Sequence, residues 1–226
     1  MTLSIKPKVN LYEWDDFYVP RENAIYFVRH AESTANAGGL SVQHALIPLS
    51  ETGILQAQDL ASTLNVRPGL VLSSEFIRTQ QTAQPFCEIH QCEFKVEPLL
   101  NEFSALSREL IIGMMGNERR PFADAYWAEA DVSKRMGVEA ETFLEFNNRV
   151  AVFLNKMEAL PNNTVVFGHG IWFGLLVWLS MGFNAKDSTQ MKAFRRFQLA
   201  LPLSNCVIYK VTHSNYGWKV GIYPLQ

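Results

Sequence analysis

Short apolar runs, each bounded by polar or turn-forming residues, recur along the chain. The first is AIYFV at residues 24–28, between Pro20 and Arg29. Similar runs lie at residues 70–72, 94–96, 165–167, 207–211 and 218–222. Runs of this length and composition are typical of buried β-strands, and the last two are close enough to pair as a hairpin.

Between the predicted strands, apolar residues recur at the spacing of a helix face. Ser50 can cap a helix that has Glu51 in its first turn and apolar residues from Ala57 to Leu64. Further helices are predicted at residues 76–89 and 122–130, and another begins near Ile171. The clearest helical face comprises Phe143, Phe146, Val150, Phe153, Leu154 and Met157.

Helices that separate short strands predict an α/β fold, with a mostly parallel sheet and helices on both faces in a three-layer sandwich. The 226 residues and the 48% apolar content suit one domain over residues 1–226, with a core at about residues 24–223. The apolar stretch at residues 164–183 is about long enough to span a bilayer. Its β-branched start and Gly-His-Gly turn instead favour a buried strand followed by a buried helix.

The overall charge gives no indication of a nucleic-acid or membrane partner, because the net charge is −2 and the pI is near 6.2. An anionic substrate must therefore be attracted by a local basic pocket. The three cysteines, Cys87, Cys92 and Cys206, form no CxxC pair and indicate thiols in a reducing compartment. The first 20 residues lack the apolar core of a signal peptide, so we expect a cytoplasmic protein.

Charged and nucleophilic side chains follow four of the predicted strands. Arg29 and His30 follow the first strand, Arg78 lies shortly after the second, Glu102 follows the third, and His169 follows the fourth inside a Gly-His-Gly turn. Because sheets of this kind hold ligands at the carboxyl ends of their strands, we expect these side chains to meet there.

This set of side chains suits phosphoryl transfer. Two arginines can neutralise the phosphoryl oxygens, and an imidazole nitrogen can attack phosphorus to form a phosphohistidine. A second histidine can donate to the equatorial oxygens, and Glu102 can protonate the leaving oxygen if burial raises its pKa. Gly168 and Gly170 would let the backbone approach the anion, toward which the helix from Ile171 would point its N-terminus.

The motif RHAESTAN at residues 29–36 resembles the RHGE motif of the histidine phosphatase superfamily, which includes cofactor-dependent phosphoglycerate mutases. Later segments are similar to further family motifs in the same order: PLSETG at 48–53, SS at 73–74, RTQQTA at 78–83, ETF at 141–143, RV at 149–150, VVFGHG at 165–170 and SNC at 204–206. The main resemblance runs from about residue 25 to residue 176, and the ordered series is more specific than any single motif.

The resemblance implies an α/β sandwich and a metal-independent phosphomonoesterase without a cofactor. It would act on a small phosphorylated metabolite through a phosphohistidine. His30 matches the phosphate-accepting histidine, His169 a member of the phosphate pocket and Glu102 the proton donor. The other positions that match the phosphate pocket are Arg29, Arg78, Asn36 and Ser33.

Individual residues also have other interpretations. Two histidines could hold zinc, but no HxH or HExxH spacing accompanies them, so we expect no metal. Glu97 and Glu109 lie near Glu102 and compete with it for the role of the acid. We expect structural contacts for Glu32, core positions for Trp172 and Trp178, and no part in the site for His44, His90 and His213.

A phosphoglycerate mutase-type phosphotransferase is the main alternative function. The mutases carry Trp-x-Asp in an interval that here, at residues 37–49, reads AGGLSVQHALIPL, which favours a hydrolase. Arg119 and Arg120 resemble an arginine pair that mutases use on the second anionic group of their substrate, although a solvated loop is the simpler interpretation of this pair. A phosphate-binding module without turnover is a third alternative. Substrate selectivity is expected in residues 103–138, and the sequence does not indicate an oligomeric state.

Overall fold

The computed structural model describes residues 23–40, 42–215 and 217–224. The first 20 residues, on which the expectation of no signal peptide rests, lie outside the described residues. The strands are β1 (Ala24–Arg29), β2 (Leu70–Ser73), β3 (Lys95–Val96), β4 (Thr164–Gly168), β5 (Ile208–Ser214) and β6 (Gly217–Ile222). The helices are α1 (Glu51–Thr63), α2 (Ile77–His90), α3 (Arg108–Ile111), α4 (Gly116–Glu129), α5 (Phe143–Lys156), α6 (Gly170–Ser180) and α7 (Ser188–Ala200), with short 3₁₀ turns η1 (His44–Leu46), η2 (Pro98–Leu100) and η3 (Met157–Ala159).

The strands form a six-stranded sheet in the order β3-β2-β4-β1-β5-β6. The pairs β3·β2, β2·β4 and β4·β1 are parallel, whereas β5 and β6 add an antiparallel hairpin at one edge. The predicted α/β class, the mostly parallel sheet and the C-terminal hairpin are confirmed.

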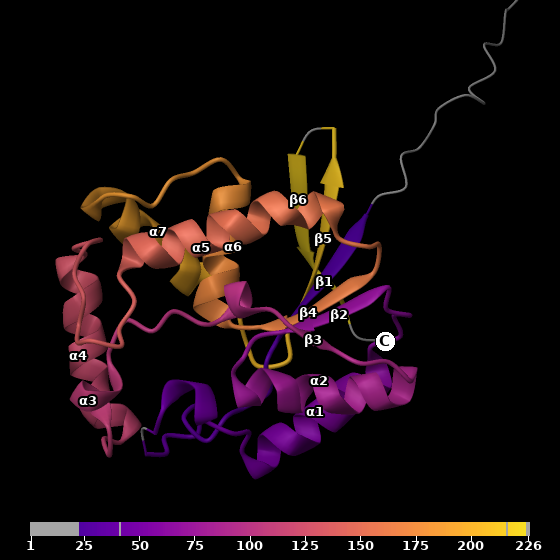
Figure 1. Cartoon of the computed structure of the whole chain (residues 1–226), viewed down its shortest axis with the longest axis horizontal. Helices are drawn as coiled ribbons and strands as arrows, with labels where there is room; N and C mark the ends of the chain where they lie inside the picture. Colours follow the sequence, from indigo (N-terminus) through magenta and orange to yellow (C-terminus); the bar gives the residue numbers. More distant parts are fainter. Residues whose placement is uncertain (1–22, 41, 216, 225–226) are drawn as a thin grey trace, which may run out of the picture.

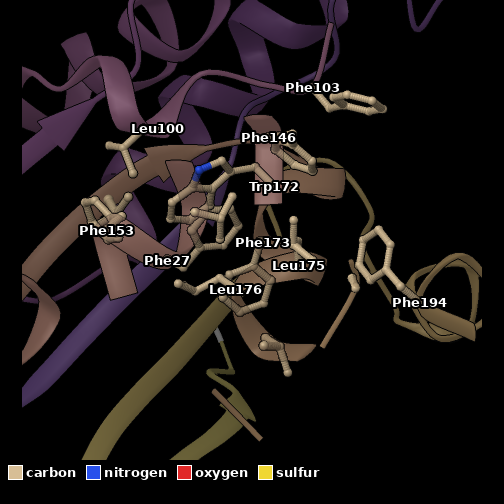
Figure 2. Packing of buried hydrophobic residues seen from close by; sticks show 14 of the residues in the cluster. Phe27, Leu100, Phe103, Phe146, Phe153, Trp172, Phe173, Leu175, Leu176 and Phe194 are labelled. Atoms are coloured by element: carbon tan, nitrogen blue, oxygen red, sulfur yellow. The ribbon is translucent and has the colours of Figure 1, made fainter. Parts of the chain in front are cut away.

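The alternating side chains of β1 bury both faces of the sheet. Tyr26 and Val28 belong to the buried cluster with α1 and α2, and Ile25 and Phe27 belong to the cluster with α5 and α6. Helices accordingly cover both faces (Figure 1), which is the predicted three-layer arrangement. In the second cluster the ring of Phe27 stacks on Phe173 with 4.0 Å between centroids, beside the fully buried Trp172 (Figure 2).

The apolar stretch at residues 164–183 forms strand β4 and helix α6, both largely buried. In the part of the chain that the structure describes, no helix has the length and apolar character needed to cross a membrane.

The helix boundaries differ from the predictions in the second half of the chain. Helix α4 begins at Gly116, six residues before the predicted start at residue 122, because the Glu118 side chain accepts from the Met115 N–H and stabilises a turn ahead of Pro121. Helices α3 and α7 were not predicted. Helix α7 buries only Met191 and Phe194, so its buried face is narrow.

The register of the sheet aligns the carboxyl ends of its parallel strands. Arg29 of β1 lies opposite Gly168 of β4, Phe167 lies opposite Ser73 of β2, and Ser73 lies opposite Val96 of β3. The residues that follow these strands therefore emerge side by side, as the sequence predicted.

Candidate active site

A cavity of about 940 Å³ opens at the carboxyl ends of the parallel strands. Arg29, His30, Arg78 and Glu102 all line it, and the buried His169 lies directly behind Arg78. The structure thus brings together the five residues that the sequence placed at strand ends.

The ring of His30 is held in one tautomer. Its Nδ1 lies 2.7 Å from the Ala31 carbonyl oxygen, which can only accept, so Nδ1 carries the proton. The unprotonated Nε2 faces the cavity and accepts from Arg78 Nε at 3.2 Å. Burial, followed by the charge of Arg78, holds the pKa of His30 well below its usual value. The ring is therefore neutral at physiological pH, with its lone pair on the cavity side.

Arg78 lies between the two site histidines. Its Nη2 lies 3.3 Å from Nδ1 of His169, whose Nε2 lies 2.8 Å from the Ser74 hydroxyl. A guanidinium has only donors, so Nδ1 of His169 accepts and its Nε2–H donates to Ser74. Burial, followed by the charge of Arg78, lowers the pKa of His169 as well. Both imidazoles are thus neutral groups around one buried cation.

Arg29 brings a second positive charge from the end of β1. It donates through Nη1 to the carbonyl of Leu203, while its buried Nε has no hydrogen-bond partner among the described residues. An anion in the cavity could satisfy this donor. A Cβ at position 170 would lie 3.5 Å from this Nε, so the first residue of α6 lies next to the guanidinium.

Ser33 and Asn36 form a polar turn at the cavity wall. The backbone N–H and the hydroxyl of Ser33 both donate to Asn36 Oδ1, at 3.2 and 3.0 Å. Asn205 holds the same turn by donating to the His30 carbonyl at 2.8 Å. Both predicted residues therefore lie beside His30, and both line the cavity.

Glu102 caps the N-terminus of helix α6. Its Oε1 accepts from the N–H groups of Phe103 and Trp172, and its Oε2 accepts from the N–H of Ile171 at 3.1 Å. The carboxylate therefore already accepts from two N–H groups at the helix end that the sequence predicted to point at the substrate anion. Burial outweighs these hydrogen bonds and raises the pKa of Glu102.

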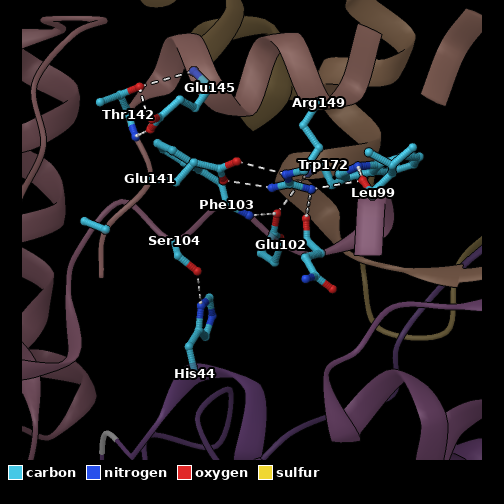
Figure 3. Close-up of polar contacts among 12 residues, drawn as sticks. His44, Leu99, Glu102, Phe103, Ser104, Glu141, Thr142, Glu145, Arg149 and Trp172 are labelled. Carbon is cyan, nitrogen blue, oxygen red and sulfur yellow. Dashed lines mark hydrogen bonds and ion pairs between the residues drawn. The ribbon is translucent and has the colours of Figure 1, made fainter. Parts of the chain in front are cut away.

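A second network holds the backbone next to Glu102 (Figure 3). Arg149 of α5 forms a bidentate ion pair with Glu141 and donates through Nη1 to the carbonyls of Leu99 and Asn101, at 3.0 and 2.7 Å. The Trp172 indole donates to the same Leu99 carbonyl at 2.7 Å. Residues of helices α5 and α6 together therefore hold Glu102 and the backbone next to it.

Glu97 and Glu109, the two alternatives to Glu102 as the proton donor, do not line the cavity. Glu97 caps η2 through the Leu99 N–H, and Glu109 is exposed and accepts from the Val138 N–H. Arg119 and Arg120 both line the cavity. Arg119 donates across it to the Ala35 carbonyl at 3.1 Å, and the exposed Arg120 pairs with Asp124.

His44 belongs to the site although no motif surrounds it. It lines the cavity, its carbonyl accepts from Arg78 Nη1 at 2.9 Å, and its Nδ1 lies 3.0 Å from Ser104 Oγ. Burial and the nearby charges of Arg78 and Arg119 lower the pKa of His44 to about 3. The expectation that His44 lies apart from the site is therefore wrong. The segment between β1 and α1 brings His44 to Arg78, and no local sequence pattern indicates this contact.

Other expectations concern residues around the site. Glu32 accepts from the Ser50 hydroxyl at 2.6 Å, and Trp172 is fully buried, as expected. A Cβ at Gly168 would lie 2.8 Å from the ring of Phe27, so the packing of the core also restricts this position to a glycine. No group of three or more His, Cys, Asp or Glu side chains suited to a metal ion occurs among the described residues.

Comparison with known proteins defines the class. A family model described as the histidine phosphatase superfamily (branch 1) matches residues 25–223. A probable phosphoglycerate mutase GpmB from Proteus mirabilis is 28% identical over 206 residues, which cover 86% of each chain. An adenosylcobalamin/alpha-ribazole phosphatase from Escherichia coli is 30% identical over 167 residues, which cover 72% of this chain and 81% of the relative.

Solved structures show the same fold. The crystal structure of a putative alpha-ribazole-5'-P phosphatase from Escherichia coli matches with a TM-score of 0.70 and 24% identity, over 88% of this chain and 94% of that one. A mycobacterial glucosyl-3-phosphoglycerate phosphatase matches with a TM-score of 0.67 and 18% identity, over 91% and 100%. The chain belongs to the histidine phosphatase superfamily. It is an enzyme of the phosphatase or mutase type that this family contains.

Proposed function

We propose that the protein hydrolyses phosphate monoesters of small metabolites through a phosphohistidine on Nε2 of His30. The observation that carries the proposal is the hydrogen bond from Nδ1 of His30 to the Ala31 carbonyl. It leaves the lone pair of a neutral imidazole on Nε2, toward the cavity, which is the state that a nucleophile requires.

The first step transfers the phosphoryl group to His30. The substrate oxygens take over donors of Arg29 and Arg78, which frees Nε2 from its contact with Arg78 Nε. Nε2 attacks phosphorus as the bond to the ester oxygen breaks. Once Nη2 of Arg78 has turned from His169 to the substrate, the proton of His169 can move from Nε2 to Nδ1, because the Ser74 hydroxyl can donate to Nε2 as well as accept from it. The Nδ1–H group then donates to an equatorial oxygen.

Glu102 supplies the proton to the leaving alcohol. Its Oε1 accepts two hydrogen bonds and its Oε2 accepts one, so we assign the proton to Oε2. The resulting carboxylate then takes a proton from water as the water attacks the phosphohistidine, which releases inorganic phosphate and restores both groups. Ser33 and Asn36 position the phosphoryl group beside His30.

The hydrolase is favoured over the mutase by residues 37–49, which lack Trp-x-Asp. The mutase remains the second candidate because Arg119 and Arg120 line the cavity, where they could hold a second anionic group. The free thiols of Cys87, Cys92 and Cys206 fit a reducing compartment, so we propose that the enzyme acts in the cytoplasm.

Rapid-quench labelling with a ³²P-phosphomonoester tests this function. We expect an acid-labile phosphoenzyme, its absence in His30→Ala, and its retention in His213→Ala, which removes a histidine paired with Glu158 at the surface. An acid-stable phosphoester on Ser33 or Thr34 would overturn the assignment. Release of the label as inorganic phosphate supports the hydrolase, whereas its transfer to an added phosphoglycerate would support the mutase.

A further inference from the structure

The cavity is much larger than a phosphoryl group requires. Its volume of about 940 Å³ lies near the upper end of the range of about 300–1,000 Å³ that is usual for drug-sized ligands. The phosphoryl-binding groups, Arg29, His30 and Arg78, occupy only the end of the cavity next to the sheet. Most of the volume therefore remains for the organic part of the substrate.

Part of the lining of this outer volume is apolar. We call it the apolar wall and define it as the cavity-lining residues Ile111, Ala123, Trp127, Leu199, Leu201 and Leu203. The wall adjoins the phosphoryl end directly, because the Leu203 carbonyl accepts from Arg29. The carbon skeleton of a phosphorylated molecule bound at Arg29 can therefore lie against these side chains.

Contacts with neighbouring side chains hold Trp127 of the wall in place. Arg195 lies over the Trp127 ring at 4.5 Å from its centroid, and Phe103 and Phe143 pack against the same ring edge-on. The same Arg195 donates to the side-chain oxygen of Gln198, the polar residue next to Leu199. Leu199 itself is 65% exposed although it lines the cavity. An apolar group in the cavity would remove this side chain from water, which is favourable.

We infer that the preferred substrates are phosphate monoesters whose alcohol part is large and predominantly apolar, rather than three-carbon phosphorylated acids. This inference rests on the proposed phosphatase activity. The phosphoryl group binds between Arg29 and Arg78, and the carbon skeleton lies along the apolar wall. Each methylene that enters the wall adds binding energy to the substrate and to the transition state alike, so kcat/KM rises with the length of the apolar part.

A series of n-alkyl phosphates from propyl to octyl tests the inference, at concentrations below those at which the esters aggregate. The basicity of the leaving alkoxide is almost constant along this series, so differences in kcat/KM report contacts with the alkyl chain. We expect an increase of about two- to fourfold per methylene, or at least about thirtyfold from propyl to octyl. We also expect octyl phosphate to be a better substrate than 3-phosphoglycerate.

A matched pair of variants separates the wall from general effects. Leu199→Asn should lower the octyl-to-propyl ratio of kcat/KM by about three- to tenfold. Leu55→Asn, which changes a leucine of similar exposure (66%) on α1 that does not line the cavity, should leave that ratio unchanged. A flat series in the wild type, or the same ratio in Leu199→Asn as in the wild type, would overturn the inference while leaving the phosphatase activity intact. Hydrolysis of none of the esters would instead overturn the proposed function itself.

Discussion

His44 contacts the guanidinium of Arg78 twice. Nη1 of Arg78 donates to the His44 carbonyl at 2.9 Å, and Nη2 lies 3.4 Å from Nε2 of the His44 ring. Because the guanidinium can only donate, Nε2 accepts and Nδ1 carries the proton toward Ser104 Oγ. The ring of His44 therefore holds the arginine that both site histidines also contact, and it does so from a loop in which the sequence gives no sign of a role.

Replacing His44 should weaken phosphate binding. His44→Ala removes a side-chain acceptor from Arg78, and a typical hydrogen bond contributes about 0.5–1.5 kcal/mol. We expect the inhibition constant of inorganic phosphate and the KM of the substrate each to rise by about two- to tenfold. His44→Gln keeps an acceptor and should restore much of the affinity. An unchanged inhibition constant in His44→Ala would mean that the backbone carbonyl alone positions Arg78.

The neutral state of His44 should also make folding depend on pH. The pKa of His44 is lowered to about 3 in the folded protein, against about 6.5 for an unperturbed histidine. Below pH 6.5 the unfolded state therefore binds a proton that the folded state does not. The stability that His44 contributes is present above pH 6.5 and is lost as the pH falls toward 3.

Urea unfolding of the wild type and of His44→Gln, measured from pH 8 to pH 5, checks this linkage. The two stability curves should run parallel above about pH 7. Below about pH 6 the wild type should lose stability faster than the variant, by about 1.4 kcal/mol per pH unit, which corresponds to one proton. Parallel curves over the whole range would show that His44 titrates alike in the folded and unfolded states.

Replacing Glu102 should matter most for poor leaving groups. An alkyl phosphate leaves as a strongly basic alkoxide that needs a proton in the transition state, whereas nitrophenolate leaves without one. General acid catalysis contributes about 10²- to 10⁴-fold, so we expect Glu102→Gln to lower kcat/KM for an alkyl ester by a factor in that range and for nitrophenyl phosphate far less.

Glu97→Gln and Glu109→Gln are the matched controls for the acid. Both carboxylates lie outside the cavity and stabilise local backbone turns, so neither change should depend on the leaving group. An equal loss on both kinds of ester for Glu102→Gln would mean that Glu102 only holds the start of α6. The acid would then have to be another group.

Activity should not depend on a divalent metal. Arg29 and Arg78 already supply positive charge beside His30. In many phosphoryl-transfer enzymes a metal ion supplies this charge. Dialysis against a chelator should leave kcat/KM unchanged. A loss of activity that zinc or magnesium restores would contradict this expectation.

The sequence predicted those parts of the site that strand ends determine. Arg29, His30 and His169 directly follow strands or end them, and the parallel register aligns these positions. His44 was missed because a loop fold, rather than a periodic pattern, carries it to Arg78. Helix α7 was missed because its buried face is narrow, and the capping of α6 by Glu102 joins residues 69 and 70 positions apart, which no local pattern can show.

The strand ends that carry Arg29, His30 and His169 come from different stretches of the chain than Ile111, Ala123 and Trp127 of the apolar wall. Residues 103–142, all of them described, add no strand to the sheet that aligns Arg29, His30 and His169. Insertions, deletions or exchanges within this stretch, away from Phe103 and Glu141, therefore need not change the strand register. Enzymes that descend from a common ancestor with this architecture can therefore keep the same chemistry while they diverge in substrate specificity. Recombination at the two ends of this stretch is one route to a new specificity.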